Sequence, residues 1–108
     1  MLSGYRIMWV IVMFDLPALT KKEKKMAIAF RNFLLDEGFE MSQLSVYIRH
    51  NASREKAEAL SKRVIKEVPT AGKVSILYFT DKQFGEIISY HNCALKSMQD
   101  KPDQYMLL

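Results

Sequence analysis

The apolar positions of this chain are densest near its start, where residues 5–14 read Tyr-Arg-Ile-Met-Trp-Val-Ile-Val-Met-Phe. β-Branched and aromatic residues of this kind favour a strand, and the turn signal Asp15-Leu16-Pro17 closes the run. Odd and even positions are both apolar, which is typical of a strand covered on both faces of its sheet. We therefore predict a central strand over residues 5–14.

A helix is predicted behind this strand. Thr20 and Glu23 have the spacing of a capping box, in which each side chain accepts a hydrogen bond from the other residue's backbone. Apolar residues then recur at helical spacing, at Met26, Ala27, Phe30, Phe33 and Leu34. Gly38 follows, and a glycine is common just past the last turn of a helix.

The next segment is extended in character. Val46 and Ile48 alternate with Tyr47 and Arg49, which is the period of a strand. The pattern fits one short strand over residues 39–43 and a second over residues 45–49. The link between them carries no strong turn dipeptide, so a single bent strand fits the sequence equally well.

A second helix and a further strand complete the pattern. Asn51-Ala52-Ser53 supplies a cap, and the apolar side of the helix consists of Ala57, Leu60, Val64 and Val68. The Pro-Thr-Ala-Gly sequence of residues 69–72 stops this helix, and residues 73–80 then read as a strand.

The predicted order is strand, helix, strand, strand, helix, strand, with one short helical turn or crossing segment within residues 81–91. This order is that of the ferredoxin-like βαββαβ sandwich, an α+β fold whose two helices cover one face of a four-stranded sheet. We assign residues 1–91 to this domain and residues 92–108 to a C-terminal tail. The tail ends in an apolar stretch at residues 105–108, which we expect to form an extra strand, either on its own chain or exchanged with a partner.

The first strand carries two alternating sets of side chains, and only one set fits under the helices. One set consists of Ile7, Trp9, Ile11 and Met13, and the other of Met8, Val10, Val12 and Phe14. The set left on the bare face of the sheet is too apolar to face water. We expect a symmetric homodimer joined sheet to sheet, because two-fold homodimers are the commonest oligomers. The alternative is that the C-terminal tail folds back over its own chain.

Length and composition indicate which class of protein this chain belongs to. The chain has 108 residues, of which 49% are hydrophobic and 26% charged, the profile of a single globular domain. No run approaches the roughly 20 apolar residues of a membrane helix, and the apolar start lacks the features of a signal peptide, so we expect a cytoplasmic protein without membrane contact. Cys93 is the only cysteine, and the positions of His50 and His91 suggest no metal site.

Basic side chains gather at the predicted start of the first helix, at Lys21, Lys22, Lys24 and Lys25. Positive charge at a helix N-terminus opposes the helix dipole, and this local cost suggests a use in binding phosphate. Arg31, Arg49 and Arg54 are further candidates for binding nucleic acid. The net charge of +4 and the isoelectric point of about 9.2 fit a polyanionic partner. The alternative is a solvated charged face that keeps the protein soluble.

Asp15 is the candidate catalytic residue, because it stands where the central strand ends. In a face-to-face dimer the ends of two such strands can approach the two-fold axis, so that two Asp15 carboxylates flank one site. Such a pair can hold Mg²⁺, which prefers oxygen ligands and accepts phosphate oxygens as further ligands. The alternative is a turn aspartate that accepts hydrogen bonds from backbone N–H groups around Leu16 and Pro17.

Three sequence elements then follow one another along the chain. They are Phe-Asp-Leu-Pro at residues 14–17, Gly-Phe-Glu-Met-Ser-Gln-Leu-Ser-Val-Tyr at residues 38–47, and Leu-Tyr-Phe-Thr-Asp-Lys-Gln-Phe at residues 77–84. In this order they resemble the Cas2 family, the smaller of the two universal CRISPR adaptation proteins. The resemblance covers nearly the whole chain. It is closest to members from type II systems, whose effector is a single large guided nuclease.

This resemblance implies properties beyond those read from the residues. It implies a ferredoxin-like fold, a symmetric dimer, and an Asp15 that binds Mg²⁺ in an endonuclease site acting on single-stranded RNA or double-stranded DNA. It also implies that the dimer bridges two dimers of the CRISPR integrase subunit and carries the incoming DNA. Many relatives have an arginine where this chain has Met41, and lysines replace arginines after Asp15. Lysine is a poorer bidentate phosphate ligand than arginine, so both changes weaken the case for efficient cleavage.

Two functions follow as hypotheses. The first is a Mg²⁺-dependent phosphodiesterase, and the second is a structural adaptor that holds duplex DNA between integrase units without cutting it. A third option, a regulatory domain that binds a small molecule, is disfavoured because the sequence has no glycine-rich ligand loop and carries a surplus of positive charge.

Overall fold

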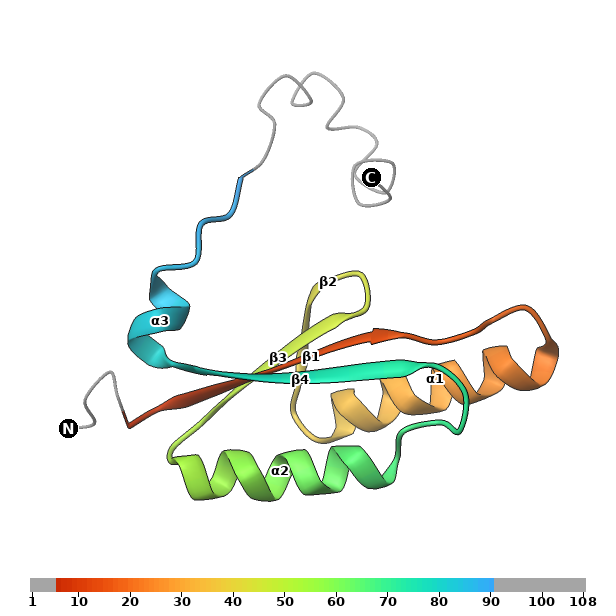
Figure 1. Cartoon of the computed structure of the whole chain (residues 1–108), viewed down its shortest axis with the longest axis horizontal. Helices are drawn as coiled ribbons and strands as arrows, with labels where there is room; N and C mark the ends of the chain where they lie inside the picture. Colours follow the sequence, from red (N-terminus) through yellow and green to blue (C-terminus); the bar gives the residue numbers. More distant parts are fainter. Residues whose placement is uncertain (1–5, 91–108) are drawn as a thin grey trace.

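Four strands and three helices form the part of the chain that the computed structural model describes, residues 6–90 (Figure 1). The strands are β1 (Met8–Asp15), β2 (Glu40–Gln43), β3 (Val46–Asn51) and β4 (Lys73–Thr80). The helices are α1 (Lys21–Asp36), α2 (Arg54–Lys66) and the short α3 (Asp81–Gly85). The sheet order is β2-β3-β1-β4, every pair is antiparallel, and α1 and α2 cover the same face. The α+β fold predicted from the sequence, consistent with a ferredoxin-like domain, is therefore confirmed, whereas the predicted tail at residues 92–108 lies outside the described residues.

Strand β1 is central, and its bounds differ from those predicted. It begins at Met8 rather than at residue 5, and it includes Asp15, which was expected to follow the strand. The reason is the length of β4, whose eight residues pair with β1 from Met8 opposite Thr80 to Asp15 opposite Lys73. The strand predicted over residues 73–80 is confirmed at both ends.

The segment after α1 forms a hairpin of two strands rather than one bent strand. Ser45, in the turn between β2 and β3, has a φ of 61°, the left-handed conformation that few side chains adopt. The register also shifts between Met41 and Gln43. This turn has no diagnostic dipeptide, which explains why the sequence left both interpretations open.

Helix α1 is capped at both ends as the sequence predicts. The Thr20 side chain accepts a hydrogen bond from the Glu23 N–H, and the Glu23 carboxylate accepts one from the Thr20 N–H, each at 3.0 Å. At the other end, Gly38 has a φ of 92°, its N–H donates to the Leu35 carbonyl, and the Phe39 N–H donates to the Leu34 carbonyl. This pair of bonds is the Schellman motif, so the chain turns directly from α1 into β2.

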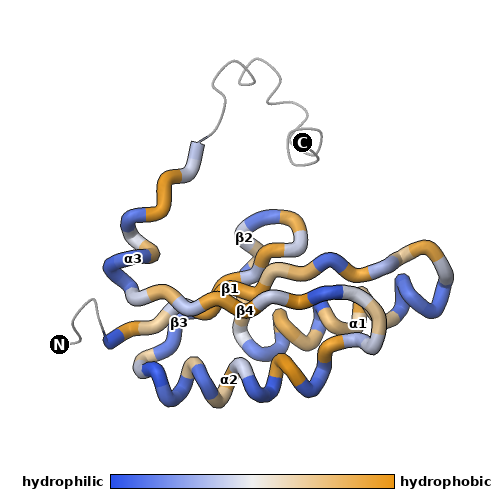
Figure 2. The backbone as a smooth tube through the Cα atoms, viewed as in Figure 1, coloured by the Kyte–Doolittle hydropathy of each residue, from blue (hydrophilic) through white to orange (hydrophobic). Residues whose placement is uncertain are grey.

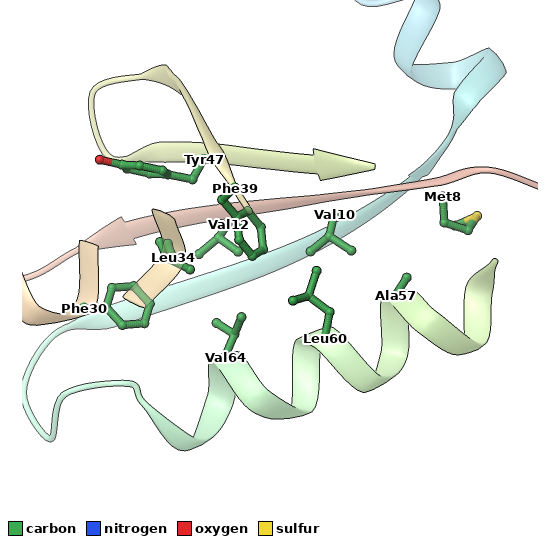
Figure 3. Packing of buried hydrophobic residues seen from close by; sticks show 10 residues of the cluster. All are labelled: Met8, Val10, Val12, Phe30, Leu34, Phe39, Tyr47, Ala57, Leu60 and Val64. Carbon is green, nitrogen blue, oxygen red and sulfur yellow. The ribbon is translucent and has the colours of Figure 1, made fainter. Parts of the chain in front are cut away.

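The core lies between the sheet and the two long helices (Figure 3). Val10 and Val12 of β1 are fully buried against Leu34 of α1 and against Leu60 and Val64 of α2. Ser53 caps α2, within the predicted Asn51-Ala52-Ser53 cap. Helix α2 ends at Lys66, so Val68, which was predicted on its apolar face, packs against the core from the following loop. Burial of several branched side chains, each contributing about 1.5–3 kcal/mol, stabilises this arrangement of helices on the sheet.

One ion pair joins the outer surfaces of α1 and α2. Nε and Nη2 of Arg63 donate to the two carboxylate oxygens of Glu37 at 3.0 and 3.1 Å. The Glu37 carboxylate raises the pKa of Arg63 through these bonds. An exposed pair adds little stability, but its bidentate geometry fixes the position of α2 relative to the end of α1.

The opposite face of the sheet, which neither α1 nor α2 covers, is called the open face below. Phe14 contacts Phe30 and Tyr47 on the helical side, so Met8, Val10, Val12 and Phe14 form the set beneath the helices. The alternate residues of β1 therefore point to the open face. At its centre Ile11 is only 9% exposed, with Ile48 and Leu77 opposite it on the neighbouring strands. Figure 2 shows that hydrophobic residues are frequent along the central strands β1 and β4.

Helix α3 crosses the open face at one end of β1 and confirms the short helical segment predicted after residue 80. Thr80 is both the last residue of β4 and the N-cap of α3. The Phe84 ring stacks on Trp9 with 3.8 Å between centroids and 8° between planes. Nε1 of Trp9 also donates to Oδ1 of Asp81 at 2.7 Å. These contacts fix α3 to the sheet although 72 positions separate Trp9 from Asp81.

The longest helix that the structure describes has 16 residues and carries several lysines, and no helix within residues 6–90 is long and apolar enough to cross a membrane.

Candidate functional site

Asp15 is the last residue of β1 and its side chain is exposed. Because Phe14 points to the helical side, the alternation of a strand places the Asp15 side chain on the open face. Within residues 6–90 its carboxylate accepts no hydrogen bond and enters no ion pair. The backbone hydrogen bonds around Leu16 and Pro17 that the alternative, a turn aspartate, expects are not among those that residues 6–90 form. As far as residues 6–90 are concerned, both carboxylate oxygens are accessible to a ligand.

The backbone around Asp15 is held by a close contact with Gly72, a role that the sequence analysis missed. Gly72 has a φ of 105°, and a Cβ at this position would lie 2.7 Å from Cδ2 of Leu16. It would also lie 3.0 Å from the Asp15 carbonyl oxygen and from Cδ of Pro17. Only glycine allows this approach without displacing its neighbours. The loop before β4 therefore packs directly against the residues that position Asp15.

A small apolar pocket of about 160 Å³ links this loop to the start of α1. Its lining residues come from three segments, namely Leu16, Pro17, Lys22, Glu23, Met26, Ala27, Pro69, Thr70 and Ala71. The pocket shows that the first turn of α1 lies at the same end of the sheet as Asp15. Lys22 of that turn lines this pocket together with Leu16, the residue that follows Asp15.

The four lysines at the start of α1 are all exposed. Glu23, in the middle of the cluster, is held by the capping box, and its backbone hydrogen bond from Thr20 is the main reason that its pKa lies below the ordinary value. A second backbone bond comes from the Leu19 N–H at 3.1 Å. The Glu23 carboxylate already accepts hydrogen bonds from the backbone at the helix N-terminus. The ammonium groups of the four lysines around it are therefore available to an external anion.

The three predicted arginines do not join this cluster. Arg31 is exposed farther along α1, and Arg49 lies against the end of that helix, where a Cβ on Gly38 would be 3.3 Å from its Nε. The Arg54 guanidinium stands 5.5 Å from the centroid of the Tyr78 ring. Arg49 pairs in register with Val10, which is on the order of 15 Å along β1 from Asp15. The predicted basic residues thus form one cluster at the start of α1 and scattered positions elsewhere.

Lys73 is a basic residue near Asp15 that the sequence analysis did not identify. It is the first residue of β4 and lies directly opposite Asp15 in the antiparallel ladder. Directly opposite residues share a face of the sheet, so Lys73 also projects from the open face. To place Lys73 beside Asp15 one must know the register of β4 on β1. That register is set by tertiary pairing and is not visible in the local sequence.

Carboxylate oxygens of this kind suit Mg²⁺, because the ion prefers hard oxygen ligands and retains several waters. Asp15 offers an exposed carboxylate that forms no ion pair with the described part of the chain, so its chemistry fits the ion. Among the described residues no three acidic, histidine or cysteine side chains converge on one point. The described residues of one chain therefore do not supply three such ligands around Asp15, and further ligands would come from a second subunit, phosphate oxygens or water.

Comparison with known proteins relates the whole chain to one family. The sequence model of the family described as CRISPR associated protein Cas2 matches residues 8–87. A protein of Paracidovorax avenae named CRISPR-associated endoribonuclease Cas2 is 50% identical over 107 residues, covering 99% of both chains. Proteins of the same name from Flavobacterium psychrophilum and Parvibaculum lavamentivorans are 46% and 47% identical, over 99% and 93% of this chain and 92% and 99% of their own lengths.

Proposed function

This chain belongs to the CRISPR-associated Cas2 family, and from that membership we propose that it acts in CRISPR adaptation as a homodimer that binds nucleic acid and hydrolyses phosphodiester bonds at Asp15. The curated relatives carry the name endoribonuclease, which makes RNA the first substrate to test and duplex DNA the second. We place this activity in the cytoplasm. The observation that carries the proposal is the exposed carboxylate at the end of the central strand, which no residue of the described range 6–90 pairs with.

The open face supports the proposed homodimer. Its central residue, Ile11, is nearly buried, and next to it Met13 remains 44% exposed. Trp9 is covered by Phe84 at one end, whereas the Asp15 end has no such cover within residues 6–90. An apolar sheet face of this kind is suited to packing against a second copy in a two-fold arrangement. Because Asp15 projects from the same face, pairing would bring two such carboxylates to one interface.

The two Asp15 carboxylates are the residues that would hold Mg²⁺. When bound, the ion would acidify a water molecule and stabilise negative charge on the attacked phosphodiester. In hydrolysis the water oxygen forms a new bond to phosphorus, the bond to one ester oxygen breaks, and that oxygen leaves with a proton. Lys21, Lys22, Lys24 and Lys25 would bind backbone phosphates farther along the nucleic acid, since they are exposed at the same end of the sheet as Asp15 but within the helical layer.

The test of this function is the substitution Asp15→Asn, which removes the charge and keeps the shape of the side chain. Wild type and variant are incubated with single-stranded RNA and with duplex DNA, in Mg²⁺ and in EDTA. We expect cleavage by the wild type in Mg²⁺ only, and a loss of at least about 100-fold in Asp15→Asn, with the dimer intact in light scattering. Equal cleavage by the variant would place the activity elsewhere, and a monomeric wild type would exclude a shared site.

A second function, that of a structural adaptor, is favoured by the exposure of all four lysines of the α1 cluster. Binding of a duplex backbone requires charge and little exact geometry, so lysines serve it as well as arginines. As an adaptor the dimer would bridge two dimers of the CRISPR integrase subunit and carry duplex DNA between them. This role predicts that Asp15→Asn, although inactive in cleavage, supports assembly with the integrase and DNA as well as wild type does. Loss of assembly in that variant would argue against it.

A further inference from the structure

The last pair of the β1–β4 ladder brings together opposite charges. Asp15 lies directly opposite Lys73, and the two side chains project from the same face of the sheet. In such a pair the Cβ atoms are about 4.5–5.5 Å apart, so both charged groups occupy one small region of surface. Both residues are exposed.

Lys73 forms no ion pair with any residue that the structure describes. The ion pairs among the described residues join Arg63 to Glu37 and Lys82 to Glu86, and no N–O distance within 4.0 Å links Lys73 to Asp15. The ammonium group stands on a flexible four-carbon stem, which allows it to reach a group bound beside Asp15.

Lys73 differs from the other basic candidates in its position. The open face carries the alternate residues of β1, β3 and β4. Among these described strand residues, Lys73 alone is a lysine or an arginine. The α1 cluster belongs to the helical layer on the other side of the sheet (Figure 1). A phosphate that approaches the Asp15 carboxylate meets a like charge, and Lys73 is the cation nearest in register to offset it.

We infer that Lys73 contacts the phosphodiester held beside Asp15, and so serves as a phosphate-binding residue of the cleavage site. This inference rests on the proposed function, because it assigns a substrate contact within the proposed site. Lysine acts here as a point charge rather than as a bidentate ligand, which suits a flexible backbone phosphate.

The first measurement is binding without metal and therefore without cleavage. A short fluorescein-labelled single-stranded RNA is titrated in EDTA with wild type, Lys73→Met, Lys73→Arg and the matched control Lys62→Met. Lys62 is exposed on α2, on the other side of the sheet, and its substitution removes the same charge. We expect Lys73→Met to weaken binding about three- to tenfold and to lower the salt slope by about one per contact. Lys73→Arg should bind as wild type, and Lys62→Met should change binding less than twofold, within the usual range of a surface substitution.

The second measurement separates direct contact from an effect on Asp15. The same titrations are repeated in the Asp15→Asn background. If Lys73 contacts phosphate itself, Lys73→Met still weakens binding in that background and still lowers the salt slope. If Lys73 only orients the Asp15 carboxylate, the effect disappears once that charge is gone, and the inference is wrong.

Different results would reject the role of Lys73 and the proposed function of the chain. If wild type binds and cleaves RNA while Lys73→Met behaves like Lys62→Met, the inference alone fails. If wild type neither binds nor cleaves nucleic acid, the proposed function fails, and the inference fails with it. In the cleavage assay a phosphate contact predicts a fall of kcat/KM in Lys73→Met, with the dependence on Mg²⁺ concentration unchanged.

Discussion

Gly72 and Leu16 approach so closely that a Cβ on the glycine would lie 2.7 Å from Cδ2 of the leucine. This contact joins the loop that precedes β4 to the residue that follows Asp15. The geometry of the candidate site thus depends on a residue whose own side chain does no chemistry.

The substitution Gly72→Ala tests this contact. The added methyl group collides with Leu16, and alanine disfavours the φ of 105°, so we expect a loss of about 1–3 kcal/mol in the free energy of unfolding, measured by urea denaturation. The matched control is Gly85→Ala, because a Cβ at Gly85 would meet no atom within 4 Å. That variant should lie within about 0.5 kcal/mol of wild type. Equal free energies of unfolding for Gly72→Ala and Gly85→Ala would show that the loop before β4 can move to accept the added methyl group, and would contradict this prediction.

Helix α3 offers a second test, through the hydrogen bond from Trp9 to Asp81. Asp81→Ala leaves the indole N–H without its partner beneath the stacked Phe84 ring, and we expect it to cost about 1–2 kcal/mol. In a Trp9→Phe background there is no N–H to lose, so Asp81→Ala should cost about 1 kcal/mol less there. The four proteins form a double-mutant cycle that is read by thermal or urea unfolding. A coupling energy near zero would exclude this bond as the anchor of α3.

The α1 cluster can be tested by the double substitution of Lys22 and Lys25 by glutamate. Reversal of two charges should weaken binding of duplex DNA and flatten its salt dependence, measured by fluorescence anisotropy at several salt concentrations. The thermal midpoint should not fall, because an acid in the first turn interacts favourably with the helix dipole. Lys62→Glu together with Lys66→Glu, on α2, provides a control with the same change of net charge. An unchanged salt slope in the α1 variant would remove these lysines from the binding surface.

The capping box predicts a dependence of stability on pH. Hydrogen bonds from the Thr20 and Leu19 backbones lower the pKa of Glu23 below its ordinary value of 4.5. A carboxyl group whose pKa is lowered by folding contributes stability above its unfolded pKa and loses that contribution as the pH falls through its folded pKa. Stability should therefore decline below about pH 4.5, and Glu23→Gln should remove part of this decline. Urea midpoints between pH 6 and pH 3 measure the difference, and parallel curves for the two proteins would contradict it.

The sequence was most informative where local chemistry sets a boundary. Thr20 with Glu23, Gly38, and Ser53 each mark a helix end through bonds made within a few residues, and the structure has those ends in place. Strand β4 was also placed correctly, since the Pro-Thr-Ala-Gly sequence of residues 69–72 ends the preceding segment and the residues after it have strand character.

The features that the sequence did not predict depend on pairing between distant segments. The inclusion of Asp15 in β1 and the position of Lys73 opposite it both follow from the register of β4, which no local pattern encodes. The choice between the two faces of β1 could not be made either, because both sets of alternating residues are apolar. The role of Gly72 was missed for a similar reason. A glycine after a helix resembles an ordinary terminator, and its close neighbours come from another part of the chain.

The junction between β4 and α3 has a practical consequence for labelling this protein. Thr80 ends the strand and caps the helix, so a residue added after it would separate the cap from Gln83 and pull Phe84 from Trp9 in one step. The β2–β3 turn at Leu44 is exposed and lies at the edge of the sheet, far from this junction in the strand order. Fluorophores and affinity tags placed in that turn should leave the domain folded, whereas the same insertions after Thr80 should not.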